Sequence, residues 1–143
     1  MKSKIYEYLM NFGFSKQDLN KIEKLNEDIY FVTLDKVIEN INFFIGKGLN
    51  NKEIINLANL NPFVLTLSSK RKNAFDEIYI NKLKLSNEEI KYLLNVNDSI
   101  YTCSPLELDN IINYLNKNYS FNFIKQIILN NPNIINKKIS EII

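Results

Sequence analysis

One stretch of this sequence, residues 48 to 68, occurs in altered form at three other places, and this repetition constrains the fold more than any other feature. Moving the stretch back by 35 positions aligns Ile54 with Leu19. Moving it forward by 36 positions aligns Ile54 with Ile90, and a further step of 34 reaches Ile124. A self-similar period of this length is typical of stacked helical repeats, in which no unit buries its apolar face alone. We place the four units at residues 1–32, 33–67, 68–103 and 104–143.

Apolar spacing and capping residues predict two helices in each unit. In the first unit, Ile5, Tyr8, Leu9 and Phe12 follow the spacing of one helix face, and Gly13 ends that helix. Residues that cap helices well recur before the first helix, at Thr33, Ser68 and Ser104, and before the second, at Ser15, Asn50, Ser86 and Ser120. In the second helix the apolar residues are three apart and are expected to form one buried stripe, as in Leu19, Ile22 and Leu25, or Ile54, Leu57 and Leu60.

A turn follows the second helix. Asn61-Pro62 and Asn131-Pro132 stop the helix there, and Asn97-Asp98 and Glu27-Asp28 are placed at the same register without proline. The short apolar run that follows, Phe63 to Leu67 in the second unit, predicts a 3₁₀ turn or stub helix, with a strand as the alternative. The predicted fold is therefore all-α, a right-handed α-solenoid of about four repeats of roughly 35 residues in a single domain.

Composition excludes several classes of site. The chain has a net charge of +2, which neither requires nor excludes a nucleic-acid partner. A single cysteine, Cys103, and no histidine fit a reducing compartment and leave no base to activate a thiol nucleophile. There is no zinc spacing, no Gly-rich phosphate loop and no apolar run long enough to cross a membrane. We expect a cytoplasmic protein that is not an enzyme, with no catalytic residues, cofactor, metal or membrane partner.

The second unit contains Phe43-Phe44, Gly48-Leu49, Glu53-Ile54 and Asn61-Pro62-Phe63-Val64-Leu65, and the other three units are more distant copies. With these features it resembles the repeat of the mitochondrial transcription termination factor family. The resemblance implies a right-handed stack of three-helix units whose concave groove binds double-stranded DNA or structured RNA through basic side chains on phosphates. It implies a binding protein rather than an enzyme. Four units and the lack of a transit-like leader favour a bacterial or minimal version.

The charge pattern departs from that family picture. The equivalents of Lys36 in later units are Arg71, Glu107 and Glu141, so this position is not basic throughout. A continuous stripe of phosphate contacts is therefore not encoded. The remaining nucleic-acid-binding candidates are the cluster at the start of one helix, two lysines at its end and a pair near the C-terminus: Lys70, Arg71, Lys72, Lys82, Lys84, Lys137 and Lys138. Solvated helix ends are the alternative interpretation of these charges.

Aromatic and apolar residues supply the other candidates. Five tyrosines would stack on bases if exposed, although their helical spacing favours packing: Tyr79, Tyr92, Tyr101, Tyr114 and Tyr119. The last unit is apolar around much of its second helix, which predicts association with a second copy or another protein through Phe121, Phe123, Ile128, Ile142 and Ile143. Two functions follow: a nucleic-acid-binding module, or a protein-interaction scaffold that makes no phosphate contacts.

Overall fold

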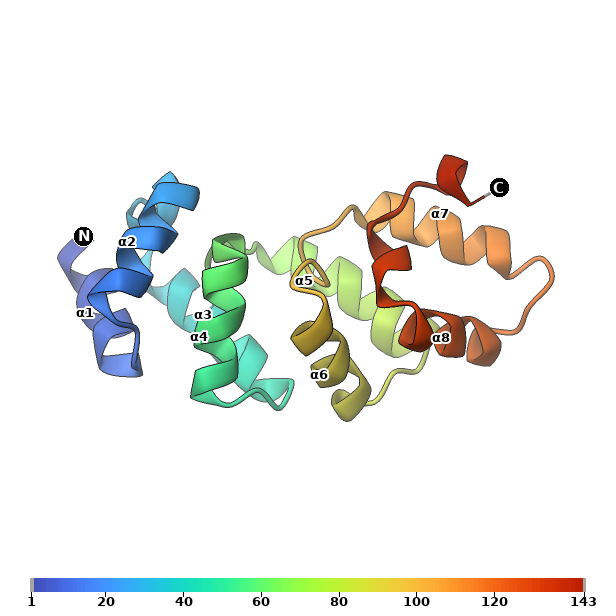
Figure 1. Cartoon of the computed structure of the whole chain (residues 1–143), viewed down its shortest axis with the longest axis horizontal. Helices are drawn as coiled ribbons and strands as arrows, with labels where there is room; N and C mark the ends of the chain where they lie inside the picture. Colours follow the sequence, from blue (N-terminus) through green and yellow to red (C-terminus); the bar gives the residue numbers. More distant parts are fainter. Residues whose placement is uncertain (1, 143) are drawn as a thin grey trace. The chain divides into compact units, whose positions relative to one another are not determined.

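The computed structural model describes the backbone of residues 2–142 and the side chains of residues 4–142 (Figure 1). Within this range all regular structure is helical and no strand occurs, which confirms the all-α prediction. The chain forms two compact units, residues 1–68 (unit 1) and 69–143 (unit 2), and the boundary lies one residue from the predicted border between the second and third repeats. None of the helices described is both long and apolar enough to cross a membrane.

Each unit contains two successive pairs of helices, and each pair is followed by a short turn. Unit 1 has α1 (Lys2–Phe12), α2 (Lys16–Leu25), the 3₁₀ helix η1 (Glu27–Tyr30), α3 (Leu34–Gly46), α4 (Asn51–Leu60) and the 3₁₀ helix η2 (Pro62–Thr66). Unit 2 has α5 (Ser69–Asp76), the π-helix η3 (Glu77–Lys82), α6 (Asn87–Val96), α7 (Pro105–Leu115), α8 (Phe121–Asn130), and the 3₁₀ helices η4 (Pro132–Asn136) and η5 (Ile139–Glu141). Residues 98–102 form a hydrogen-bonded turn at the place of η1 and η2.

The helix starts are those that the capping residues predict. Ser15, Asn50 and Ser86 each form a reciprocal capping box with the acidic residue three positions later. Thr33, Ser104 and Ser120 accept a hydrogen bond from the third residue of their helices, and α5 begins directly after Ser68. Side-chain caps satisfy backbone N–H groups that the helix leaves free, which is why these positions can be read from sequence. The 3₁₀ form of residues 62–66 is also confirmed, against the strand alternative.

The second helix of every pair ends in the same way, at an asparagine. Asn26, Asn61, Asn97 and Asn131 all have φ between −146° and −129°, and each N–H donates to the carbonyl four residues earlier. The placement of Glu27-Asp28 at this register is therefore wrong by one residue, because the structure puts Asn26 at the helix end and Glu27 at the position of Pro62. Asparagine recurs at this place because its side chain has a structural role.

Two of these asparagines join successive helix pairs, an arrangement that we call the asparagine clamp. In unit 1, Asn26 is buried, and its Nδ2 donates to the carbonyl of Pro62 at 3.3 Å and to Thr66 Oγ1 at 3.2 Å. In unit 2, Asn97 is also buried, and its Nδ2 donates to the carbonyl of Pro132 at 3.1 Å and to Asn136 Oδ1 at 2.7 Å. In both units the clamp joins the end of one second helix to the 3₁₀ turn of the next pair.

Removing either clamp should destabilise the unit that contains it. Asn26→Ala deletes the two clamp hydrogen bonds, and Asn97→Ala deletes its two clamp hydrogen bonds and the bond that Asn97 Oδ1 accepts from the Ser99 N–H. Each change leaves a proline carbonyl without its donor, so we expect a loss of about 1–3 kcal/mol in the free energy of unfolding. Urea unfolding followed by circular dichroism measures this. Asn56→Ala is the matched control, because Asn56 is exposed on α4 and alanine is the better helix former. Equal unfolding midpoints for the control and the clamp variants would contradict a structural role of the clamp.

A second tie fastens the segment after each second helix to the first helix of the pair. In unit 1 the buried Asn40 on α3 donates Nδ2 to the carbonyls of Leu65 at 3.0 Å and Leu67 at 3.1 Å. In unit 2 the buried hydroxyl of Tyr79 donates to the carbonyl of Ile100. The two units therefore tie this segment to the first helix with different side chains, which bond different carbonyls of the segment.

The π-helix η3 takes up one extra residue. Fifteen positions separate Thr33 from Gly48 in the second repeat, and sixteen separate Ser68 from Lys84 in the third. A π-turn is one residue wider than an α-turn, and Leu83 N–H accordingly donates to the carbonyl of Ile78, five residues earlier. The sequence pattern predicted one helix from Lys70 to Lys84 without this wide turn, although the change of period from 35 to 36 residues is the trace of the insertion.

Lys84 in unit 2 has a backbone conformation that unit 1 gives to glycine at both equivalent positions. Its φ is +57°, the one positive value among the described residues other than glycine, while the equivalent Gly13 and Gly48 have φ of +131° and +95°. A side chain with a Cβ is strained in this left-handed region. The turn between the two helices requires the conformation, and Lys84 adopts it at a cost.

Replacing Lys84 should therefore separate side-chain and backbone effects. We expect Lys84→Gly to raise the free energy of unfolding by about 1 kcal/mol because it removes the Cβ from a left-handed position. Lys84→Ala keeps the Cβ and should leave stability nearly unchanged. Thermal unfolding of the two variants beside the wild type makes the comparison, and a glycine variant no more stable than the alanine variant would contradict the strain.

The core is mostly aliphatic, but the last apolar residue of the predicted stripe in three of the second helices lies at the surface. Ile54 and Leu57 are buried as expected, as are their equivalents in the first and third repeats. Leu25, Leu60 and Val96 are instead about half exposed. Steps of three residues fall short of the helical turn of about 3.6 residues, so the third apolar residue rotates to the edge of the stripe. The prediction that these three residues belong to the buried stripe is therefore wrong.

Candidate interaction site

The basic cluster at the start of α5 does not form one patch. Lys70 is exposed, Arg71 is partly buried and Lys72 is buried. Three consecutive residues of a helix point in three directions about 100° apart, so adjacency in sequence does not bring their charges together on one face. Of the three, Lys70 is the one whose side chain is open to solvent.

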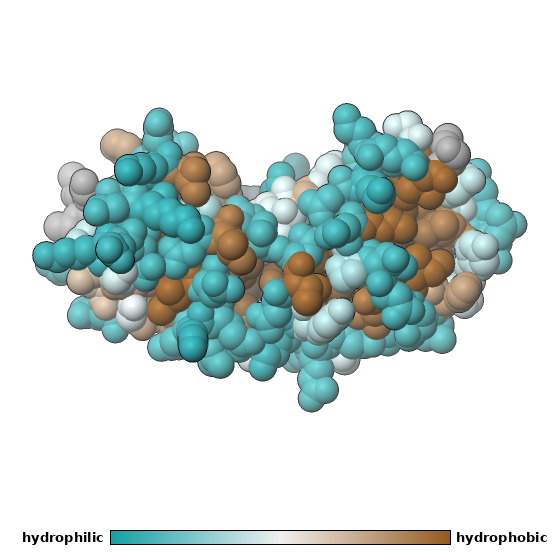
Figure 2. Space-filling view, viewed as in Figure 1, coloured by the Kyte–Doolittle hydropathy of each residue, from teal (hydrophilic) through white to brown (hydrophobic). Residues whose placement is uncertain are grey.

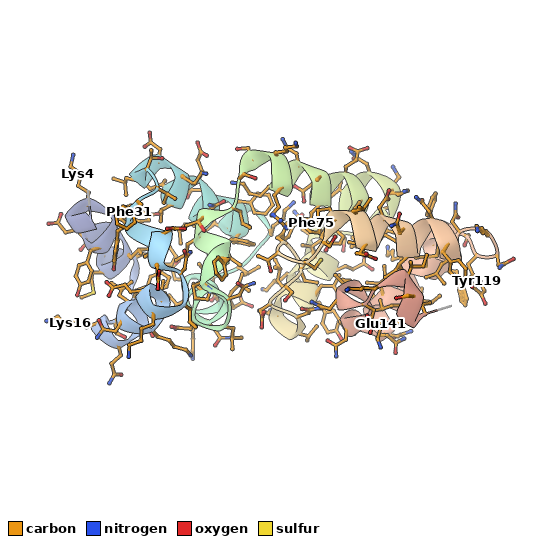
Figure 3. All side chains as sticks on the ribbon, turned by 90° about the horizontal axis from the view of Figure 1, so that it is seen from above. Lys4, Lys16, Phe31, Phe75, Tyr119 and Glu141 are labelled. Atoms are coloured by element: carbon orange, nitrogen blue, oxygen red, sulfur yellow. The ribbon has the colours of Figure 1, made fainter. Side chains whose placement is uncertain are left out.

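Arg71 belongs to an aromatic cluster inside unit 2. Its Nη1 donates to the carbonyl of Cys103 at 2.9 Å, and its guanidinium lies 5.9 Å from the ring centre of Phe75 (labelled in Figure 3). Tyr79 and Tyr101 pack against the same ring, with centroid distances of 5.7 Å in each case. A charge-assisted hydrogen bond to a carbonyl stabilises this segment, so Arg71 is a structural residue here.

The tyrosines divide between core and surface. Tyr79 and Tyr101 are fully buried and Tyr101 donates its hydroxyl to Asp76 Oδ1 at 2.7 Å, which removes both from any base-stacking role. Burial, and then the hydrogen bond to Asp76, raise the pKa of Tyr101. Tyr92 and Tyr119 are about half exposed, and Tyr119 packs beside Phe123 at 5.0 Å between ring centres.

Cys103 has the environment of a structural thiol, as its sequence context predicts. Burial raises the pKa of the Cys103 thiol to about 11. Hydrogen bonds and the charge of Arg71 oppose this shift but do not cancel it. A thiol with a raised pKa carries little thiolate at neutral pH and is a poor nucleophile.

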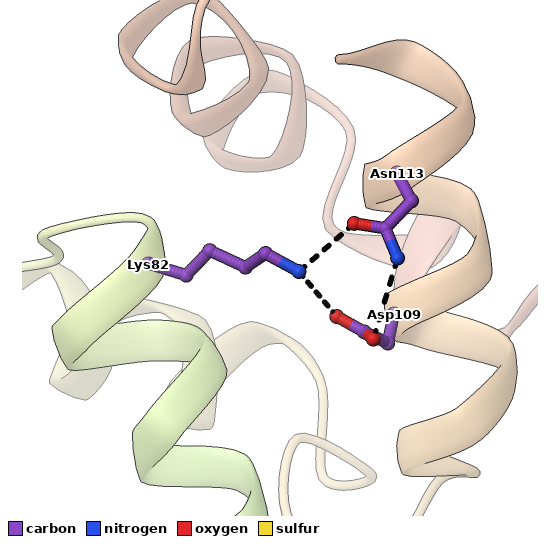
Figure 4. A network of polar contacts seen from close by, with 3 residues as sticks. All are labelled: Lys82, Asp109 and Asn113. Atoms are coloured by element: carbon purple, nitrogen blue, oxygen red, sulfur yellow. Dashed lines mark hydrogen bonds and ion pairs between the residues drawn. The ribbon is translucent and has the colours of Figure 1, made fainter. Parts of the chain in front are cut away.

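Lys82 is paired within unit 2. Its Nζ lies 2.7 Å from Asp109 Oδ1 and 2.9 Å from Asn113 Oδ1, both on α7, and Asn113 Nδ2 donates to the other oxygen of Asp109 (Figure 4). The network joins the end of η3 to α7. A lysine already neutralised by a carboxylate adds little to phosphate binding.

Beside this network lies a cleft of about 780 Å³, which we call the α5–α7 cleft. Its apolar lining comes from α5, η3, the start of α7 and the start of α8: Ala74, Ile78, Pro105, Leu106 and Phe121. Its polar lining comprises Glu77, Asn81, Lys82, Lys84 and Asp109. Leu106 is 70% exposed and lines the cleft with four other apolar residues, so it is part of an apolar surface rather than an isolated apolar side chain. Figure 2 shows hydrophobic side chains at the surface of the part of the molecule formed by α7 and α8.

The charges around the α5–α7 cleft are balanced. Lys82 and Lys84 face an equal number of carboxylates, Glu77 and Asp109. Nearby, Lys125 pairs with Glu89 at 2.9 Å. Burial by itself raises the pKa of Glu89, but the Ser86 N–H and Lys125 outweigh this and hold that pKa below its ordinary range. Unit 2 therefore presents mixed charge here rather than a positive groove.

The remaining candidates near the C-terminus divide in the same way. Lys137 and Lys138 are exposed, Phe123 is exposed, and Phe121 and Ile142 are partly exposed. Ile128 is 1% exposed and belongs to the core, so its prediction as an association residue is wrong. Because α8 is apolar around much of its circumference, the sequence did not indicate which face is buried. In the structure it is the face that carries Ile124 and Ile128. Ile143 lies outside the described residues.

Leu106 was not among the residues predicted from the sequence. Its signal was its spacing, because a helical turn of about 3.6 residues places it away from the face that carries the buried Leu108, Ile111 and Ile112. Among residues 2–142, no cluster of three or more His, Cys, Asp and Glu side chains could hold a metal ion. Compared with models of known protein families and with curated proteins, the sequence matches none of them.

Proposed function

We propose that this chain is a helical-repeat scaffold that binds a segment of another protein in the α5–α7 cleft. The observation that carries the proposal is the apolar lining of that cleft, which includes the largely exposed Leu106 and the partly exposed Phe121. Apolar clefts of several hundred Å³ with a few polar groups at the rim are typical binding sites. An amphipathic helix would place its apolar face on the floor and its polar face at the charged rim.

The proposal includes the finer architecture, a right-handed solenoid of four repeats. Its support is the recurrence of local features: the shared cap positions, the asparagine that ends each second helix, and the positive φ at Gly13, Gly48 and Lys84. Stacked repeats bind extended partners through surfaces built from equivalent positions. The exposed Leu25, Leu60 and Val96 occupy one such equivalent position in three of the proposed repeats.

A selection of peptides tests the cleft. We expect short random peptides displayed on phage and selected on the wild-type chain to converge on apolar residues at helical spacing. Leu106→Asp should weaken the selected peptides about 10- to 100-fold, because it removes one buried leucine contact and adds a charge. Leu25→Asp, the same change at an exposed leucine of unit 1, is the control and should retain binding. The cleft would be ruled out as the site if the selected peptides shared no sequence pattern. It would also be ruled out if Leu106→Asp and Leu25→Asp lost equal affinity for them.

The second candidate function is binding of duplex DNA or structured RNA, motivated by the family resemblance and by four exposed lysines, Lys70, Lys84, Lys137 and Lys138. Arg71 and Lys82 are unsuitable for testing it, since their substitution breaks contacts inside unit 2. The informative variant is the triple charge reversal of Lys70, Lys137 and Lys138 to glutamate. Lys16→Glu, an exposed lysine of unit 1, is the control.

If nucleic acid is the ligand, duplexes should bind at about 50 mM salt and dissociate steeply as salt rises. The triple variant should then bind more weakly and with a shallower salt dependence, by about one unit of slope for each phosphate that its side chains no longer neutralise. Absence of binding at low salt, or unchanged binding by the triple variant, would leave the protein-binding function.

A further inference from the structure

One end of unit 2 carries a clamp asparagine whose side chain is turned back. Asn131 ends α8 with the same backbone conformation as Asn26 and Asn97. Its Nδ2, however, donates to the carbonyl of Ile127 in its own helix, at 3.2 Å, and the residue is exposed. The equivalent donor in Asn26 and Asn97 holds the 3₁₀ turn of the next helix pair. Asn131 therefore offers a donor of the clamp type at a surface.

The surface beside Asn131 is hollow. A cleft of about 520 Å³, which we call the C-terminal cleft, is lined by Asn130, Asn131, Pro132, Asn133, Ile134, Lys137, Glu141 and Ile142. Ile134 and Ile142 are partly exposed and give it an apolar wall. Lys137 and Lys138 are exposed at or next to its rim. The cleft thus combines an apolar wall, a hydrogen-bond donor and positive charge.

Unit 1 presents a turn of the type that the clamp binds. Counting back 35 positions from Pro62 and Thr66, the two clamp acceptors in unit 1, leads to Glu27 and Phe31. These residues begin and follow the 3₁₀ helix η1. Phe31 is 86% exposed, the highest value among the exposed large hydrophobic side chains (Figure 3). Glu27 and Asp28 are exposed and acidic, opposite in sign to Lys137 and Lys138.

From this complementarity we infer that two copies of the chain associate head to tail, with η1 of one copy on the C-terminal cleft of the other. Asn131 Nδ2 turns from Ile127 to the carbonyl of Glu27 in the second copy, as Asn26 holds Pro62 within one chain. Phe31 enters the cleft against Ile134 and Ile142. Glu27 and Asp28 of the one copy meet Lys137 and Lys138 of the other, which fixes the register. Such an interface is heterologous, and it extends into a chain of copies or closes into a ring.

Two variants that damage opposite ends test this inference. Phe31→Asp spoils the η1 end, and Lys137→Glu with Lys138→Glu spoils the cleft end; all three positions are exposed, so folding should persist. In sedimentation velocity over a wide concentration range, the wild type should grow beyond its 16.8 kDa monomer. Each variant alone should associate at least roughly tenfold more weakly. Phe63→Asp, an exposed phenylalanine of η2, is the matched control and should behave as the wild type.

An equimolar mixture of the two variants gives the decisive result. One intact η1 end and one intact cleft remain, so the mixture should form a dimer and nothing larger. Adding Glu27→Lys and Asp28→Lys to the cleft variant should restore its self-association by exchanging the charges. A wild type that stays monomeric at every concentration, or a mixture that fails to pair, overturns the inference. So does a loss in Phe63→Asp equal to that in Phe31→Asp. These outcomes are independent of peptide binding in the α5–α7 cleft, which uses other residues.

Discussion

A buried side-chain amide at the end of a helix is the interaction on which this architecture depends. Asn26 and Asn97 each lie where a helix has run out of internal hydrogen-bond partners, and each reaches into the next helix pair to bond a proline carbonyl. A buried amide without partners would be costly, so the asparagine is stable only when the next 3₁₀ turn stands at the right distance. Aliphatic contacts supply most of the stabilisation, but hydrophobic contacts are non-directional. The amide fixes the position of one helix pair on its neighbour.

Several basic side chains already have partners within the fold or are buried, and this limits the ligands that the surface can bind. Arg71 bonds a backbone carbonyl, Lys82 is neutralised by Asp109, and Lys72 is buried. What remains exposed includes apolar side chains, Leu106 and Phe31 above all, together with lysines at separate places. A surface of this kind is better suited to protein partners than to a polyanion, whose binding depends on several unpaired cations along one path.

The sequence predicted local structure well because local structure here follows from short-range chemistry. Ser15, Asn50 and Ser86 cap helices through neighbours three residues away, and this spacing is visible in a string of letters. The surface was harder to predict. Whether Leu25 or Ile128 is exposed depends on how a helix is rotated against its neighbours, and whether Arg71 can reach a ligand depends on a carbonyl 32 residues away. Asn26 was missed as the helix end because the turn was placed at Glu27-Asp28, although the 35-residue step that aligns Leu19 with Ile54 also aligns Asn26 with Asn61.

The π-turn in η3 shows how a helix can hold an additional residue without losing its packing. An extra residue in an ordinary helix would rotate everything after it by about 100° and take the following side chains off the core. Confined to one wide turn, the insertion leaves Phe75 before it and Leu83 after it both buried. A change of length can thus be absorbed inside a helix, and not only in a loop, while the residues on both sides keep their packing. Deletions at the same place would be absorbed by returning the turn to its ordinary width.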